Sequence, residues 1–154
     1  MQTLQFKISV GAPVRDVYRI MLDKDDYRKW SSEFNPTSYY EGSWKKGDKI
    51  LFIGLNSEGK REGMVSKIKE NIPEKFVSIE HLGLIDGDKE ITDGPEVREW
   101  AGAKENYSFE EQGQSTTIVT VDLDVTFNDE FKAYFEDAWP RALRKLKEIC
   151  ERKS

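Results

Sequence analysis

The chain has 154 residues, the size of one ordinary domain, and carries 24 Lys and Arg against 29 Asp and Glu, a net charge of −5 at pH 7. This surplus of carboxylates argues against nucleic-acid binding, and no apolar run approaches the roughly 20 residues that span a bilayer. The first residues already alternate apolar and polar side chains, so we expect no signal peptide, and the single cysteine, Cys150, fits a reducing compartment. We expect a single domain over residues 1–154, located in the cytoplasm.

The first third of the chain predicts one strand and two short helices. Residues 3–10 alternate apolar and polar side chains, which is the pattern of a half-buried strand. Pro13 suits the first position of a helix over residues 13–22. Asp23 is suited to cap a second short helix, which would bury Trp30.

The middle of the chain predicts a series of antiparallel strands joined by turns rich in Gly, Pro, Asn and Ser. These strands are expected at residues 38–41, 49–55, 62–72, 75–83 and 100–110. Residues 84–98 are acidic and contain Gly and Pro, so we expect them to form an exposed loop instead of a strand.

The last third of the chain predicts a strand over residues 116–127 that runs through Asn128 and Asp129 into one long helix ending near Glu151. The apolar positions of this helix recur every three or four residues and define one face. They are Phe131, Phe135, Ala138, Ala142, Leu146 and Ile149. Because two of these positions are alanine, either the sheet fills the space beneath the helix or a hollow remains.

Several short motifs are spread along the whole chain, and their order is more informative than any one of them. They are Ala12-Pro13-Val14, Trp30, Gly42-Ser43-Trp44 with Gly47-Asp48, Gly63 with Ile72-Pro73, and Phe131…Trp139-Pro140…Leu143…Leu146-Lys147. The chain thereby resembles the START-like or Bet v 1-like (SRPBCC) superfamily, and within it the group similar to the C-terminal domain of activators of the Hsp90 ATPase. The resemblance implies an α+β helix-grip fold. In that fold a curved antiparallel sheet of about six to seven strands wraps around the long C-terminal helix.

The resemblance also implies an internal cavity that binds apolar molecules such as lipids, sterols or polyketides. Some relatives are cyclases or dehydratases and others are co-chaperones, so the fold does not decide the function. Aromatic residues are the strongest signal for such a cavity, since the chain has four Trp, six Tyr and eight Phe. Those expected to border the space between sheet and helix are Trp30, Phe34, Phe52, Trp100, Tyr107, Phe135 and Trp139. The alternative is that they simply fill the core.

His81 is the only histidine, and it would serve with Tyr107 as a polar anchor if it points into the cavity. We prefer a structural histidine bonded to a backbone group, because a lone titratable side chain lacks a geometric partner. One histidine excludes a two-histidine metal site and gives no choice of triad partner. The acidic loop has Val97 at the position where a calcium loop counted from Asp86 needs a glutamate. We therefore assign no catalytic residue, metal or cofactor.

The main prediction is that the protein binds an apolar or amphipathic small molecule, lipid-like or polyketide-like, between the sheet and the C-terminal helix. One alternative is a protein-interaction module resembling the Hsp90-activator domain, which would use the loop 84–98 or the basic end of the last helix. The other is an enzyme of the cyclase or dehydratase type. If the basic end of the last helix binds no partner, its Lys and Arg residues simply form a solvated face. Monomer and homodimer both stay open, because exposed edge strands can pair between subunits.

Overall fold

The computed structural model describes residues 2–125 and 129–153, with side chains from residue 132 onward in the second range. The predictions that concern Phe127, Asn128 and the side chain of Phe131 lie outside the described residues. The four described helices are α1 (Val14–Leu22), α2 (Lys24–Ser31), α3 (Pro95–Arg98) and α4 (Asp129–Lys153). The described strands are β1 (Gln2–Val10), β2 (Tyr39–Gly42), β3 (Lys49–Leu55), β4 (Arg61–Ile72), β5 (Phe76–Asp86), β6 (Lys89–Ile91), β7 (Lys104–Glu111) and β8 (Thr117–Val125).

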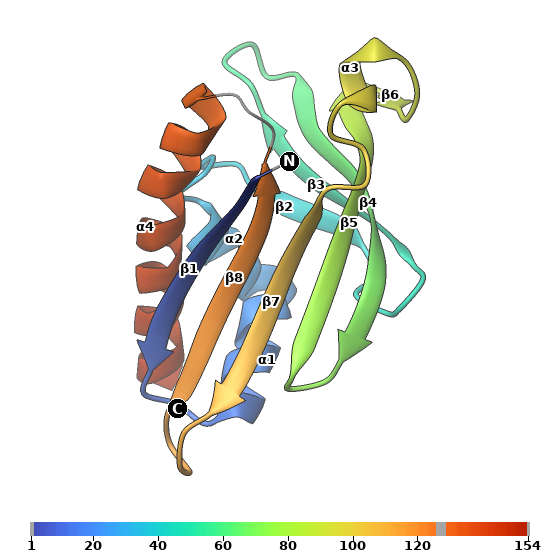
Figure 1. The fold of residues 1–154 in the computed structure, drawn as a ribbon. Coiled ribbons are helices and arrows are strands. Elements are labelled where there is room, and N and C mark those ends of the chain that lie inside the picture. The colour runs from blue at the N-terminus through green and yellow to red at the C-terminus, as the bar shows by residue number, and fades with distance from the viewer. Residues whose placement is uncertain (1, 126–128, 154) are drawn as a thin grey trace.

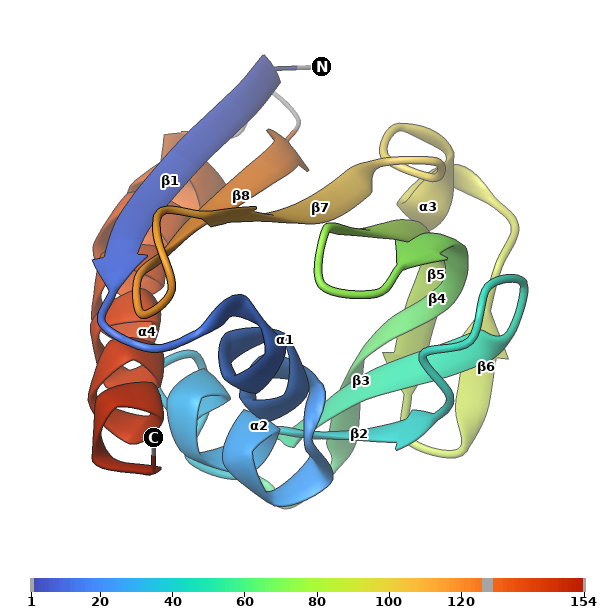
Figure 2. The ribbon, with the colours of Figure 1, turned by 90° about the horizontal axis from the view of Figure 1, so that it is seen from below.

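The strands form one antiparallel sheet with the order β1-β8-β7-β5-β4-β3-β2, and β6 pairs with the far end of β5 (Figure 1). Seen from below, the sheet curves around α1, while α4 and α2 lie along its open side (Figure 2). Helix α4 packs against β1 and against α2, and α2 packs against β2. The helices therefore connect the two edges of the sheet, and the predicted α+β helix-grip architecture is confirmed.

Local sequence signals place the helix boundaries well. The side chain of Asp23 accepts hydrogen bonds from the backbone N–H groups of Asp25 and Asp26, both at 3.1 Å, and thus caps α2 as predicted. Helix α1 begins directly after Pro13. None of the described helices is long and apolar enough to cross a membrane.

The predicted exposed loop at residues 84–98 is wrong in part. Strand β5 continues to Asp86, and the segment then forms β6 and the short helix α3. Ile85 and Val97 are buried, which explains why this segment folds onto the sheet. Gly83 permits the close pairing, because a Cβ at this position would overlap the carbonyl oxygen of Ile91.

Both faces of the sheet carry buried apolar residues near β3 and β4. Ile50 belongs to the main core between sheet and helices. Ile53 belongs to a second, smaller cluster with Val65 and Ile85. Ile50 and Ile53 are an odd number of residues apart on one strand, so they point to opposite faces and enter different cores.

Helix α4 buries the face that its spacing predicted. The buried side chains on this helix are Ala138, Trp139, Ala142, Leu143, Leu146, Ile149 and Cys150. Phe135 is partly buried and packs against the same core. The last turn of α4 is also attached to α2, because the Nζ of Lys153 lies 3.0 and 3.1 Å from the two carboxylate oxygens of Asp26. Asp26 is only 1% exposed, so its charge depends on this partner and on Lys29 at 3.7 Å.

Candidate functional site

Trp139 of α4 is the centre of a group of aromatic rings between the helix and the sheet. Its ring centroid lies 4.9 Å from that of Phe34, 5.9 Å from Trp30 and 6.2 Å from Tyr107. Phe6 of β1 stacks on it from the other side at 6.4 Å. Four of the seven aromatic residues predicted from the sequence therefore belong to this group, Trp139 itself and three rings that contact it.

A second group of rings lies around Tyr27 of α2. The Tyr27 ring lies 5.1 Å from Tyr40, 6.0 Å from Phe52 and 6.4 Å from Trp44. Phe52 in turn reaches the imidazole of His81 at 6.4 Å. Of these residues, Tyr27, Tyr40 and Trp44 were not predicted as site residues. Tyr40 and Trp44 lie in a short strand and the following turn, which give no apolar periodicity that points inward.

His81 belongs to a chain of polar side chains that we call the polar cluster: Ser66, His81, Glu105 and Tyr107. The Oγ of Ser66 lies 2.7 Å from Nδ1 of His81, and Nε2 of His81 lies 3.4 Å from Oε1 of Glu105. The hydroxyl of Tyr107 donates to Oε2 of the same carboxylate. The preferred prediction of a histidine bonded to a backbone group is thus wrong for the ring, whose partners are two side chains.

These partners assign the protons of the imidazole. A carboxylate can only accept, so the nitrogen facing Glu105 carries a proton. When the ring carries no second proton, Nδ1 accepts from the hydroxyl of Ser66. Ser66 is fully buried, and its oxygen is directed at the ring, so it offers no exposed nucleophile.

Strand pairing builds the polar cluster. Ser66 of β4 stands opposite His81 of β5, directly after a register shift between Val65 and Ser66. Glu105 of β7 stands opposite Ile79, two residues before His81, and Tyr107 follows on the same face of β7. The backbone N–H of His81 donates to the carbonyl of Ala103 at 2.9 Å, which fixes β5 against the start of β7. All four side chains therefore point from the concave face of the sheet.

The polar cluster is buried unequally. The side chains of His81 and Glu105 are 10% and 16% exposed, whereas Ser66 and Tyr107 are almost completely covered. Burial raises the pKa of Tyr107 well above its ordinary value, and the negative charge of Glu105 raises it further. Tyr107 therefore stays a neutral donor. Burial and the same carboxylate also raise the pKa of Tyr27, so Glu105 acts on both aromatic groups.

Two of the predicted site residues, Trp100 and Phe135, have other surroundings than the residues described above. Trp100 precedes β7 in the turn after α3, where its indole N–H donates to the carbonyl of Glu96 at 2.9 Å. It is not among the rings around Trp139 or Tyr27 within the described contacts. Phe135 is on α4, one turn before Trp139, and its ring contacts Tyr134 at 5.4 Å.

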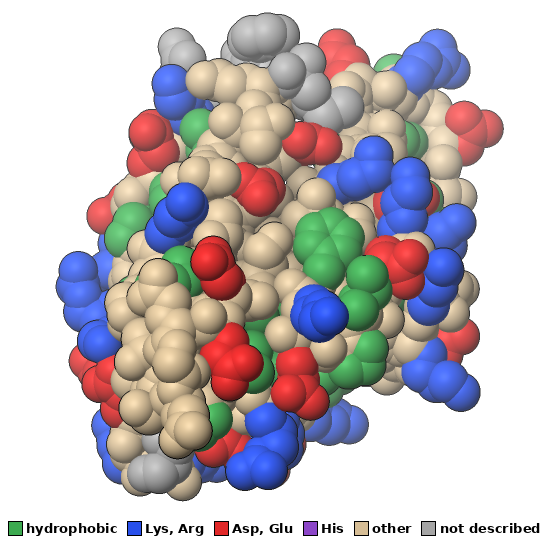
Figure 3. Space-filling model, turned by 60° about the horizontal axis from the view of Figure 1, so that its bottom comes forward, with side chains coloured by type: hydrophobic (Ala, Val, Ile, Leu, Met, Phe, Trp, Pro, Cys, Tyr) green, Lys and Arg blue, Asp and Glu red, His purple; other side chains and the backbone are tan. Residues whose placement is uncertain are grey.

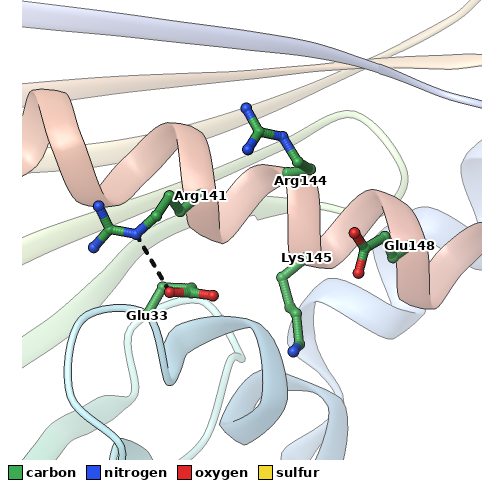
Figure 4. A pocket seen from close by; sticks show the side chains of 5 residues that line it. All are labelled: Glu33, Arg141, Arg144, Lys145 and Glu148. Carbon is green, nitrogen blue, oxygen red and sulfur yellow. Dashed lines mark hydrogen bonds and ion pairs between the residues drawn. The ribbon is translucent and has the colours of Figure 1, made fainter.

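A groove of about 280 Å³ lies on the outer surface between α4 and the end of α2 (Figure 4). Its lining residues are all charged: Glu33, Arg141, Arg144, Lys145 and Glu148. Arg141 pairs with Glu33, its Nε lying 3.4 Å from Oε2, and with Asp137. Arg144 and Lys145 form no ion pair with any residue that the structure describes. Figure 4 shows Lys145 extending toward the α2 side of the groove and Arg144 pointing away from it.

The rest of the chain offers fewer candidates. Among the described residues, no three His, Cys, Asp or Glu side chains gather as metal ligands. On the face drawn in Figure 3, positive and negative side chains are interspersed and hydrophobic side chains reach the surface only in small groups. A curved sheet closed by a long helix over an interior rich in aromatic rings defines the START-like, helix-grip class of proteins.

The chain belongs to the family described as Activator of Hsp90 ATPase homolog 1-like protein, whose sequence model matches residues 11–151. No curated protein is significantly similar to it in sequence.

Solved structures show the same fold at low sequence identity. The Aha1 dimer from Colwellia psychrerythraea is 23% identical, with a TM-score of 0.71 over 98% of this chain and 97% of that chain. A START superfamily protein from Mycobacterium smegmatis is 11% identical, with a TM-score of 0.66 over 99% of both chains. A protein from Nitrosomonas europaea is 16% identical, with a TM-score of 0.73 over 98% of this chain and 95% of that chain.

Proposed function

We propose that this protein binds an apolar or amphipathic small molecule, lipid-like or polyketide-like, between the sheet and α4. The observation that carries the proposal is the polar cluster set among aromatic rings, with His81 and Glu105 still partly exposed. Burying a carboxylate and an imidazole in an apolar interior is unfavourable unless they have partners. Binding sites combine apolar walls with a few convergent polar groups of this kind.

Partly buried aromatic side chains support the same conclusion. Phe34, Phe52 and Phe135 pack against the main core without being fully covered by it. They come from the turn after α2, from β3 and from the first half of α4. Their remaining apolar surface would contribute to affinity when a ligand covers it.

Native mass spectrometry of the purified protein, compared with its denatured mass, tests this function. We expect a mass excess that disappears on denaturation, and the released compound then identifies the ligand class. A clean mass, together with no thermal shift across a panel of lipids and polyketides, would contradict the proposal.

Two neighbouring residues on β3 provide a matched pair of variants for that ligand. Phe52→Ala removes a ring that contacts Tyr27, Trp44 and His81, so affinity should fall at least about tenfold. Leu51→Ala removes a partly buried apolar side chain that packs with the smaller cluster on the other face. It should lower stability without lowering affinity. Equal loss of affinity in both variants would indicate a general effect of destabilisation and count against the site.

A second candidate function is binding to a chaperone of the Hsp90 type, which the family description suggests. The charged groove favours it, because Arg144 and Lys145 are without ion pairs in the described part of the chain and are available to an acidic surface. If this function holds, the Arg144→Glu/Lys145→Glu variant loses binding to purified Hsp90. Lys7→Glu/Lys69→Glu makes the same charge change on exposed strand positions and should retain it. Failure of the unmodified protein to bind Hsp90 or alter its ATPase rate would exclude this candidate.

Homodimerisation stays a prediction for this chain. The dimer of the Colwellia protein supports it.

A further inference from the structure

The hydrogen-bond donors of the polar cluster are already used within the protein. Tyr107 donates its hydroxyl proton to Glu105, and Nε2 of His81 faces the same carboxylate at 3.4 Å. The Ser66 hydroxyl is directed at Nδ1 of His81 and is fully buried. Each donor of this cluster thus already faces an acceptor of the protein.

The carboxylate of Glu105, in contrast, can still accept further hydrogen bonds. A carboxylate has about four lone-pair positions, and each oxygen of Glu105 has one partner within the cluster. Glu105 is also the most exposed member of the cluster. A ligand that reaches this end of the interior thus meets acceptors, and it must itself supply the hydrogen-bond donor.

The charge of the surroundings points the same way. Among the described residues, the buried polar or charged set contains no Lys or Arg. Its members are Asp26, Ser31, Ser66, Ser78, His81 and Thr117. A ligand carboxylate would therefore lie beside Glu105 without an opposite charge, which is strongly unfavourable at low dielectric. An ammonium group would meet the carboxylate and the faces of aromatic rings, both of which attract cations.

On the basis of the proposed function, we infer that the interior site takes ligands whose polar head donates hydrogen bonds, a hydroxyl or an ammonium group. It discriminates against ligands that end in a carboxylate, such as fatty acids. Glu105 is the residue that determines this specificity, and Tyr107 and His81 hold its carboxylate in place.

Three probes with the same apolar chain test this inference: dodecanol, dodecylamine and dodecanoate, each titrated below its micelle concentration and followed by tryptophan fluorescence and calorimetry. The alcohol and the amine should bind at least about tenfold more tightly than the acid. A difference between the alcohol and the amine separates the contribution of hydrogen bonding from that of charge.

Glu105→Gln keeps the shape of the side chain and removes its charge. In this variant the amine should lose affinity, the acid should gain it, and the alcohol should change little, because the amide still offers a carbonyl oxygen. Glu110→Gln makes the same charge change on an exposed position of β7 and should leave all three affinities unchanged. It thus controls for the net negative charge of the protein.

The possible outcomes distinguish the inference about the ligand head group from the proposed function. If the acid binds the unmodified protein as tightly as the amine and the alcohol, the inference is overturned while the proposed function stands. If Glu110→Gln shifts the affinities as much as Glu105→Gln does, the preference comes from net charge and the inference is again overturned. Binding of none of the probes, with a clean native mass, would overturn the proposed function itself.

Discussion

Raising the pH from about 8 to about 11 should lower the free energy of unfolding by about 6 kcal/mol. Burial raises the pKa of the Cys150 thiol from 9.0 to about 12, and it also raises the pKa of Tyr27 and of Tyr107 above 10.0. In the unfolded chain these three groups release their protons near their ordinary pKa values. In the folded protein they keep them.

The sign follows from proton linkage. Above about pH 9 the unfolded state binds fewer protons than the native state, so unfolding becomes easier as the pH rises. At about pH 11 the thiol contributes about 3 kcal/mol of the loss and each tyrosine about 1.4 kcal/mol. Urea denaturation at a series of pH values measures the effect. Cys150→Ala removes one of the three groups and should reduce the pH-dependent loss by about half, whereas an unchanged pH profile in this variant would show that the thiol titrates normally in the folded protein.

Trp139→Ala should destabilise the protein by about 3–5 kcal/mol. Trp139 is 3% exposed and contacts rings from β1, α2, β7 and the turn after α2, so its removal leaves a cavity bounded by separate elements. For a protein of this size the midpoint of thermal unfolding should fall by roughly 10 °C.

Arg144→Ala, five residues further along the same helix, is the appropriate control. Its side chain is exposed and forms no ion pair among the described residues, so stability should change by less than about 0.5 kcal/mol. A loss below about 1 kcal/mol for Trp139→Ala would show that the neighbouring rings move in to fill the space. Trp139 would then be a replaceable part of the lining.

The features that were predicted correctly from the sequence are those set by neighbouring residues. The cap at Asp23 depends on the backbone N–H groups two and three residues further on. The alternation that became β8 and the buried face of α4 depend on a local period of two or of three to four residues. The prediction for residues 84–98 was wrong in part because the structure of this segment depends on contacts with residues distant in the sequence. Its acidic, Gly-containing sequence resembles a loop, yet Ile85 and Val97 find buried positions once β6 pairs with β5.

The polar cluster shows the same limit more sharply. His81 was recognised as a candidate, but Ser66 and Glu105 were not, because each comes from a different strand. The register shift next to Ser66 decides which side chain of β4 stands opposite His81, and no local pattern in the sequence reveals that shift. The aromatic residues were easier to find, since large rings mark the interior whatever their partners are.

The position of β1 at the edge of the sheet has a consequence for biosynthesis. Its only partner strand is β8, in the register Gln2 to Val125 and Val10 to Thr117. At ribosomal speeds of about 5–20 residues per second, β1 waits on the order of ten seconds for that partner. During this interval its apolar side chains, Leu4, Phe6, Ile8 and Val10, have no sheet to cover them. The nascent chain thus presents an unpaired apolar strand until β8 has been translated, and closure of the sheet is a late event that depends on protection of that strand from aggregation.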